Sequence, residues 1–139
     1  MVEFIFNTLT AIGYNGPIHP INTHIPMGLV LGGFLFAVAS FKWNILRETA
    51  YHCYTISLAF LPITIVSGIL DWQYRLAGVM VNYILAKLIL AGTLAILLAG
   101  VLYLYKKKNP AYPFLVLLFA PSFLNGILLG FIGGKLMFQ

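Results

Sequence analysis

Three histidines and a few charged residues are the side chains in this sequence that could take part in chemistry. His19 and His24 lie five residues apart in the stretch GPIHPINTHIP, and His52 follows in AYHCYT. An imidazole can ligate haem iron, or it can carry a proton near neutral pH. Asp71 and Arg75 stand four residues apart, a spacing that places both on one side of a helix. The elements that carry these residues decide which of them can meet.

Those elements belong to a very apolar chain. Its 139 residues are 61% hydrophobic and only 8% charged, and the mean hydropathy is +0.96. Because a soluble domain is about 45–50% apolar, the sequence predicts an all-α integral membrane protein whose main partner is the lipid bilayer. Most of the positive charge lies in two short gaps between apolar runs, which is typical of cytoplasmic loops. We therefore expect no nucleic-acid partner.

Four apolar runs are long enough to cross a bilayer, which takes about 20 residues each. They cover residues 23–43, 49–72, 79–105 and 112–138 and predict one transmembrane domain, a four-helix bundle. The segment before Gly13 is too short to span, so we expect it to lie along the membrane interface. Thr23 is the predicted N-cap of the first span, with Pro26 in its first turn.

The distribution of Lys and Arg predicts an orientation. Lys42 and Arg47 follow the first span, and three lysines at 106–108 follow the third, whereas the opposite side holds Arg75 and Lys135. By the positive-inside rule, both termini lie on the periplasmic side of a bacterial cytoplasmic (inner) membrane. His19, His24, Asp71 and Arg75 then share the outer side, and His52 lies near the inner side.

The stretch IHPINTHIPMGL resembles the opening of a family of small bacterial membrane proteins known as domain of unknown function 2231. The matching positions are His19, Pro20, His24, Pro26 and Gly28, and SGILDW at residues 67–72 is similar to the end of that family's second span. The resemblance implies four spans over nearly the whole chain and an association with electron transfer or haem b. Many members carry a histidine early in the third span, where this sequence has Asn82 and Lys87.

Depth restricts what the histidines can do together. At about 1.5 Å per helical residue, His24 and His52 differ in depth by roughly 15–20 Å. One haem iron needs both ligands within about 2 Å, so these two are candidate metal ligands of different haems, each with a second ligand from elsewhere. His24 is the stronger candidate. His19, Asp71, Arg75 and Lys87 are further candidates for binding a cofactor, with Asp71 as an acceptor that orients an imidazole.

Lys87 lies well inside the third span, where an ammonium either snorkels to the interface or needs an anion such as Asp71. Small residues recur at four-residue spacing and can pack helices within the bundle, or dock a second copy or a partner subunit. They are Gly28 and Gly32, Ala91, Ala95 and Ala99, and Gly126, Gly130 and Gly134.

The sequence contains no motif of a soluble enzyme, which disfavours a stand-alone catalyst. We expect a subunit of a redox or respiratory assembly that aids electron transfer through a haem or quinone site near His24, beside other membrane or periplasmic redox subunits. Two alternatives stay open. One is a structural subunit without a cofactor. The other is a proton or ion conduit with steps at His24, Lys87 and His52.

Overall fold

A computed structural model of the chain describes residues 2–108 and 111–137, and these residues form five helices and no strand. The helices are α1 (Val2–Ala11), α2 (His19–Ala39), α3 (Leu46–Arg75), α4 (Asn82–Lys108) and α5 (Tyr112–Met137). The last four are each long and apolar enough to cross a membrane. The predicted all-α fold with four spans is therefore confirmed, and the chain is a multi-pass membrane protein.

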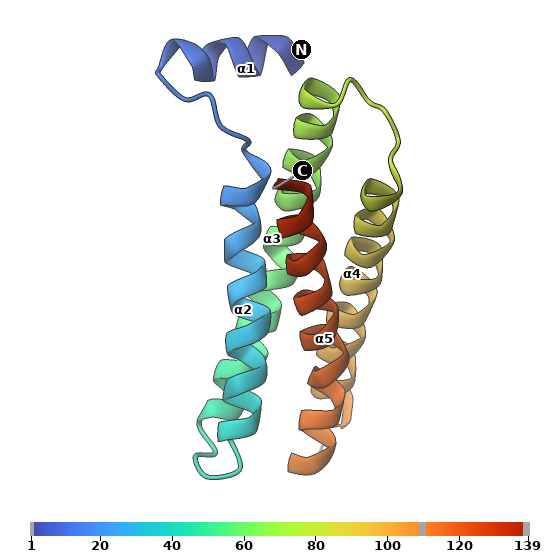
Figure 1. The fold of residues 1–139 in the computed structure, drawn as a ribbon. Helices are drawn as coiled ribbons and strands as arrows, with labels where there is room; N and C mark the ends of the chain where they lie inside the picture. The colour runs from blue at the N-terminus through green and yellow to red at the C-terminus, as the bar shows by residue number, and fades with distance from the viewer. Residues whose placement is uncertain (1, 109–110, 138–139) are drawn as a thin grey trace.

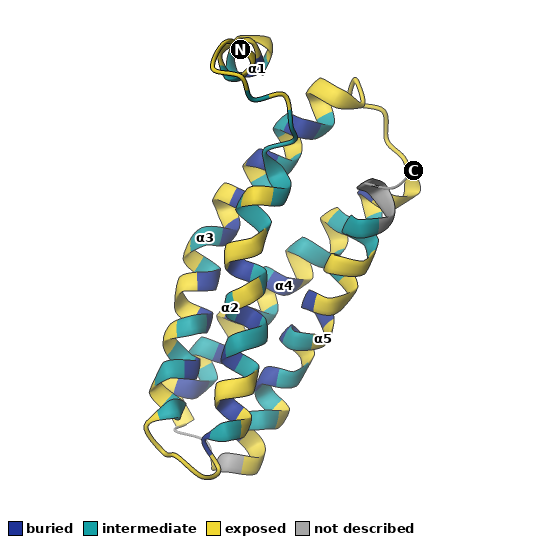
Figure 2. Cartoon of the chain, turned by 60° about the vertical axis from the view of Figure 1, so that its left-hand side comes forward, coloured by how far each residue is buried: buried dark blue, intermediate teal, exposed yellow. Residues whose placement is uncertain are grey.

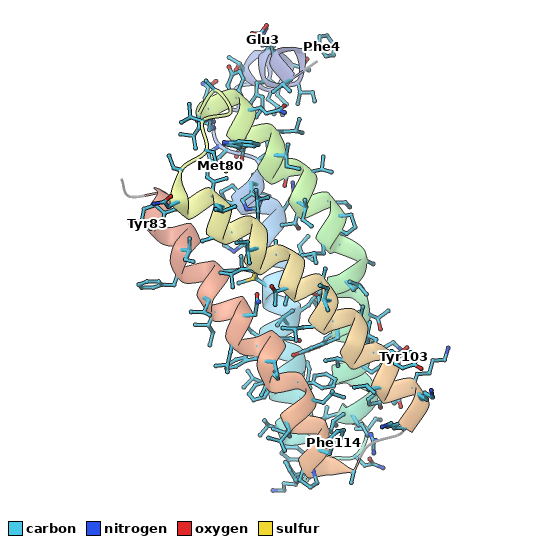
Figure 3. The ribbon with its side chains drawn as sticks, turned by 90° about the vertical axis from the view of Figure 1, so that its right-hand side faces the viewer. Glu3, Phe4, Met80, Tyr83, Tyr103 and Phe114 are labelled. Carbon is cyan, nitrogen blue, oxygen red and sulfur yellow. The ribbon has the colours of Figure 1, made fainter. Side chains whose placement is uncertain are left out.

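The four long helices run up and down as two hairpins (Figure 1). α2 packs most extensively against α3, and α4 packs against α5, while α2–α5 and α3–α4 contacts close the bundle. The short helix α1 lies across one end, called here the α1 end, where α5 also ends. Met80 and Tyr83 lie toward that end, and Tyr103 and Phe114 lie at the opposite, Tyr103 end (Figure 3).

The helix limits differ from the predicted ones, most clearly in α2. This helix begins at His19, with Pro20 in its first turn, whereas the predicted span begins at residue 23. The prediction that Thr23 is the N-cap is wrong, because its hydroxyl lies inside the helix and donates to the His19 carbonyl oxygen at 2.7 Å. Pro26, placed by the sequence in the first turn, is in the helix interior.

The limits of the other helices differ less from the predicted ones. α3 extends beyond the predicted 49–72 at both ends, and α4 covers Asn82–Lys108 in place of 79–105. α5 begins at Tyr112 as predicted, while position 138, the predicted end of the fourth span, lies outside the described residues.

Many large apolar side chains lie on the outside of the bundle, while its interior holds several polar side chains beside an apolar core. Figure 2 shows the buried residues as patches along the facing sides of the helices. On α3 the buried residues recur every three or four positions, so they form one inner face: Ala50, Tyr54, Ser57, Leu61, Thr64, Ser67 and Asp71. Besides Tyr54, four of these seven have hydroxyl or carboxylate side chains: Ser57, Thr64, Ser67 and Asp71. By contrast, Ile56, Ile63 and Val66 point outward.

The glycines pack differently from one helix to another. A Cβ on Gly126 would lie 3.5 Å from Val30, and one on Gly130 would lie 3.6 Å from Met27, so these two α5 glycines support packing within the bundle. A Cβ on Gly28 or Gly32 would meet no atom of the described residues within 4 Å. The α2 pair therefore faces outward.

Candidate functional site

The α1 end of the bundle contains a polar cluster that begins with Asp71 on α3. This carboxylate is 9% exposed and accepts hydrogen bonds from two backbone amides at the start of α2, at 3.2 Å from Ile18 N, just before the helix, and at 2.7 Å from His19 N. The first amides of a helix have no partner within the helix, and their dipoles attract an anion. Asp71 therefore caps α2 from the neighbouring helix, and this cap explains why α2 begins at His19.

Thr64, two turns earlier on the same inner face, completes the attachment of α2. Pro26 has no amide hydrogen, which leaves the Asn22 carbonyl without its helical donor. The Thr64 hydroxyl donates to that carbonyl oxygen at 3.2 Å. One turn further along α2, the Pro26 carbonyl oxygen accepts a hydrogen bond from the Ser57 hydroxyl of α3 at 3.0 Å. Thr64 thus satisfies the carbonyl that Pro26 frees in α2, and Ser57 adds a second hydrogen bond to the α2 backbone.

The side chain of His19 points into the bundle, where it lies close to Thr64 and Gly68 of α3. Its Nδ1 lies 3.0 Å from the Thr64 carbonyl oxygen, which can only accept, so Nδ1 carries the hydrogen. Gly68 makes this approach possible, because a Cβ at that position would stand 2.9 Å from Nδ1. The second ring nitrogen, Nε2, is left to face the other helices.

Lys87 of α4 reaches Nε2 from the other hairpin. Its Nζ lies 3.3 Å from His19 Nε2 and beside the bare backbone of α5, 3.9 Å from where a Cβ on Gly133 would be. A charged ammonium can only donate, so Nε2 accepts and His19 is neutral in this arrangement. Thr23 Oγ1 also lies 3.3 Å from Nε2. The His19–Lys87 pair therefore links the α2–α3 hairpin to the α4–α5 hairpin.

This geometry can exchange one proton within the membrane. Moving a proton from Lys87 Nζ to His19 Nε2 converts an ammonium and a neutral imidazole into an amine and an imidazolium. The net charge of the cluster, including the Asp71 carboxylate, stays the same. Intramembrane ionisable groups mark functional sites by default, because isolated charges in lipid are costly. The cluster is a candidate site for proton transfer or for hydrogen bonding to a polar headgroup.

The structure also places the remaining residues that the sequence singles out. Arg75 Nη2 donates to the Asn15 carbonyl oxygen at 2.8 Å, so it holds the segment that precedes α2. His24 is exposed on the outside of the bundle. His52 is exposed too, and its Nδ1 lies 2.7 Å from the Glu48 carbonyl oxygen, which leaves Nε2 open. Only His19, Asp71 and Lys87 come together.

The three histidines do not form a pair of interior ligands for one haem. His24 and His52 face outward from different helices, and His19 uses both ring nitrogens within the bundle. Among the described residues, no group of three or more His, Cys, Asp or Glu side chains could hold a metal ion. A haem on His24 or His52 would sit on the outer surface with its second ligand from another chain.

The structure adds two residues to the site, Thr64 and Gly68. Thr64 supplies the carbonyl that orients His19, and Gly68 gives the imidazole its space. A signal for them exists in the sequence: Ser57, Thr64, Gly68 and Asp71 share the spacing of one helix face. A small or polar residue at each of those positions indicates a face that receives another helix.

Fold and cluster together define a polytopic α-helical membrane protein with an ionisable site between two helical hairpins. No protein-family model, curated protein or solved structure matches the chain.

Proposed function

We propose that the protein is a membrane subunit of a redox assembly in which His19 and Lys87 bind a quinone headgroup and exchange protons with it. The observation that supports this proposal is the contact of 3.3 Å between Lys87 Nζ and His19 Nε2, two ionisable side chains that meet inside a bundle of membrane-spanning helices. Reduction of a quinone takes up two electrons and two protons. The electrons come from a redox centre of a partner subunit, and this chain supplies hydrogen-bond donors and a proton route.

The position of the pair suits such a ligand. His19 begins α2 and Lys87 lies in the second turn of α4, so both are close to the α1 end of the bundle. A quinone headgroup carries two carbonyl oxygens that accept hydrogen bonds, while its isoprenoid tail requires lipid. Near the membrane interface, Lys87 Nζ can donate to one of these oxygens, and His19 Nε2 can donate to the other when it carries the proton received from Lys87.

The three histidines make the test direct. In protein labelled with ¹⁵N-histidine and placed in lipid nanodiscs, we expect ubiquinone-1 to shift the His19 ring signals saturably and to leave those of His24 and His52 unchanged. Lys87→Met should abolish the shift, whereas Lys106→Met at the other end should not. Equal shifts of all three histidines, or none, would contradict quinone binding here.

A structural role is the second candidate, and specific contacts favour it. Asp71, Thr64 and Ser57 all bond to the backbone of α2. In a purely structural subunit, Lys87→Met should lower the unfolding temperature without any effect of ubiquinone-1 on the wild type. The same labelled samples therefore separate the two functions.

A further inference from the structure

A second polar layer lies in the middle of the bundle on α5. Ser122 is fully buried and Asn125 is 6% exposed. Within the described part of the chain, neither the Ser122 hydroxyl oxygen nor the Asn125 side-chain carbonyl oxygen has a hydrogen-bond partner. Leaving a buried polar group unpaired costs about 1–3 kcal/mol, so two such groups side by side require an explanation.

The buried hydroxyls of α3 show what the rest of the bundle does with such groups. Ser57 and Thr64 both donate to carbonyl oxygens of α2, and the Ser67 hydroxyl donates to the Thr64 carbonyl oxygen at 2.9 Å. Interior polar groups are thus paired on α3, and Ser122 and Asn125 depart from that pattern.

Both α5 groups are buried between residues of α5 that contact α3 and α2. One turn before Ser122, the Phe119 carbonyl oxygen accepts the Tyr54 hydroxyl of α3 at 3.1 Å. One residue after Asn125, the bare Cα of Gly126 faces Val30 and Met27 of α2. The unpaired atoms therefore lie close to the α2–α5 contact, near the point where the Tyr54 side chain of α3 reaches α5.

We propose that Ser122 and Asn125 bind water in the middle of the bundle. Residues three apart on a helix have Cβ atoms about 5–6 Å apart, and two successive hydrogen bonds through a water oxygen span a similar length at about 2.8 Å each. One water molecule can donate to the Asn125 carbonyl oxygen and accept from the Ser122 hydroxyl. Buried water typically makes about three such bonds.

Met27 separates this site from the cluster at the α1 end. Its Sδ would lie 4.0 Å and its Cε 3.9 Å from a Cβ on Gly126, and Cε would lie 3.6 Å from one on Gly130. Further along the same helix, Gly133 lies beside Lys87 Nζ. The thioether therefore covers the α5 backbone between the two polar layers, so the water site is distinct from the His19–Lys87 pair and does not depend on its function.

Water-edited solid-state NMR of the labelled protein in bilayers tests the site directly, because it measures how fast magnetisation passes from water to each carbon. We expect the Ser122 Cβ and the Asn125 side-chain carbonyl to receive it several-fold faster than the buried Val30, which is the control for depth. Rates equal to that of Val30 would overturn the proposal.

Variants extend the test to the bridging geometry. Asn125→Leu should slow transfer to Ser122 to the rate of Val30. Ser122→Ala is the smaller change and serves as the test if Asn125→Leu does not fold. It should likewise slow the transfer of magnetisation from water to Asn125. Unchanged transfer in a folded variant would show that no water joins the two residues.

Discussion

The imidazole of His19 fits into the bundle because residue 68 is a glycine and carries no Cβ. A Cβ on Gly68 would lie 2.9 Å from His19 Nδ1 and 3.1 Å from Cε1. These atoms belong to a ring whose Nδ1 is held by the Thr64 carbonyl, so the ring cannot turn aside without losing that hydrogen bond.

Gly68→Ala is therefore expected to expel the imidazole or to push α2 away from α3. The cost of such overpacking is about 1–3 kcal/mol in the free energy of unfolding. The measurement is denaturant unfolding in detergent, with Gly92→Ala as the matched control, since a Cβ there would meet none of the described atoms within 4 Å. Equal stability of the two variants would show that Gly68 does not make room for His19.

Residue chemistry could be predicted from the sequence only in part. The sequence indicates His19, His24, Asp71 and Arg75 as polar groups on one side of the membrane and Lys87 inside the third span, but not which of them meet. That depends on the rotation of α2 about its axis, which turns His19 inward and His24 outward. Rotation is set by packing against α3, and periodicity is a poor guide to it when a helix is apolar on all sides.

At the scale of elements, the start of α2 is determined by another helix. Ile18, the residue before α2, has no side chain that can cap it, and the Asp71 carboxylate performs that role from α3. Local sequence rules search for a cap next to the helix, and for that reason they select Thr23. A cap supplied from residues far along the chain can be found only once the neighbouring helix is in place.

Removing that cap should loosen the first turn of α2. In Asp71→Ala we expect the amides of Ile18 and His19 to exchange with deuterium much faster, because each loses a hydrogen bond to a charged acceptor worth about 1.5–3 kcal/mol. Asp71→Asn keeps one acceptor oxygen and should give an intermediate result. Glu3→Gln, on the exposed side of α1, serves as the control. Unaltered exchange in Asp71→Ala would rule out the cap.

For the whole molecule, the distribution of charge predicts an orientation in the membrane. Lys42 and Arg47 lie on either side of the α2–α3 turn, and α4 ends in three lysines, so these five cations share the Tyr103 end. Aromatic rings accompany them: Lys42 lies 5.0 Å from the Trp43 ring centroid and Lys107 lies 5.3 Å from that of Tyr103. Cations next to aromatic rings are typical of a cytoplasmic interface.

We accordingly expect both termini outside the cytoplasm when the chain is made in a Gram-negative bacterium. Alkaline phosphatase fused to the C-terminus should be active, and a green fluorescent protein fused there should be dark. Replacing Lys42, Arg47 and Lys106–Lys108 by Asn or Gln should produce a mixed orientation. The opposite reporter pattern in the wild type would reverse the assignment.

The architecture could be predicted from the sequence much further than the site could. Four apolar runs of sufficient length leave few arrangements, because lipid requires every backbone group to bond within its own helix. The interior polar layers could not be read in the same way. Ser122 and Asn125 are isolated polar residues in an apolar run, and only the packing of α5 against α2 and α4 shows that both are buried.

The link between Lys87 and His19 also bears on how the protein is made. Ribosomes release the α2–α3 hairpin first, and its own contacts through Asp71, Thr64 and Ser57 need nothing from the later helices. α4 then enters the bilayer with Lys87 in its second turn. The α2–α3 hairpin already presents the lone pair of His19 Nε2, because the Thr64 carbonyl holds the imidazole in position. The first half of the chain thus provides the acceptor for a charge in the second half.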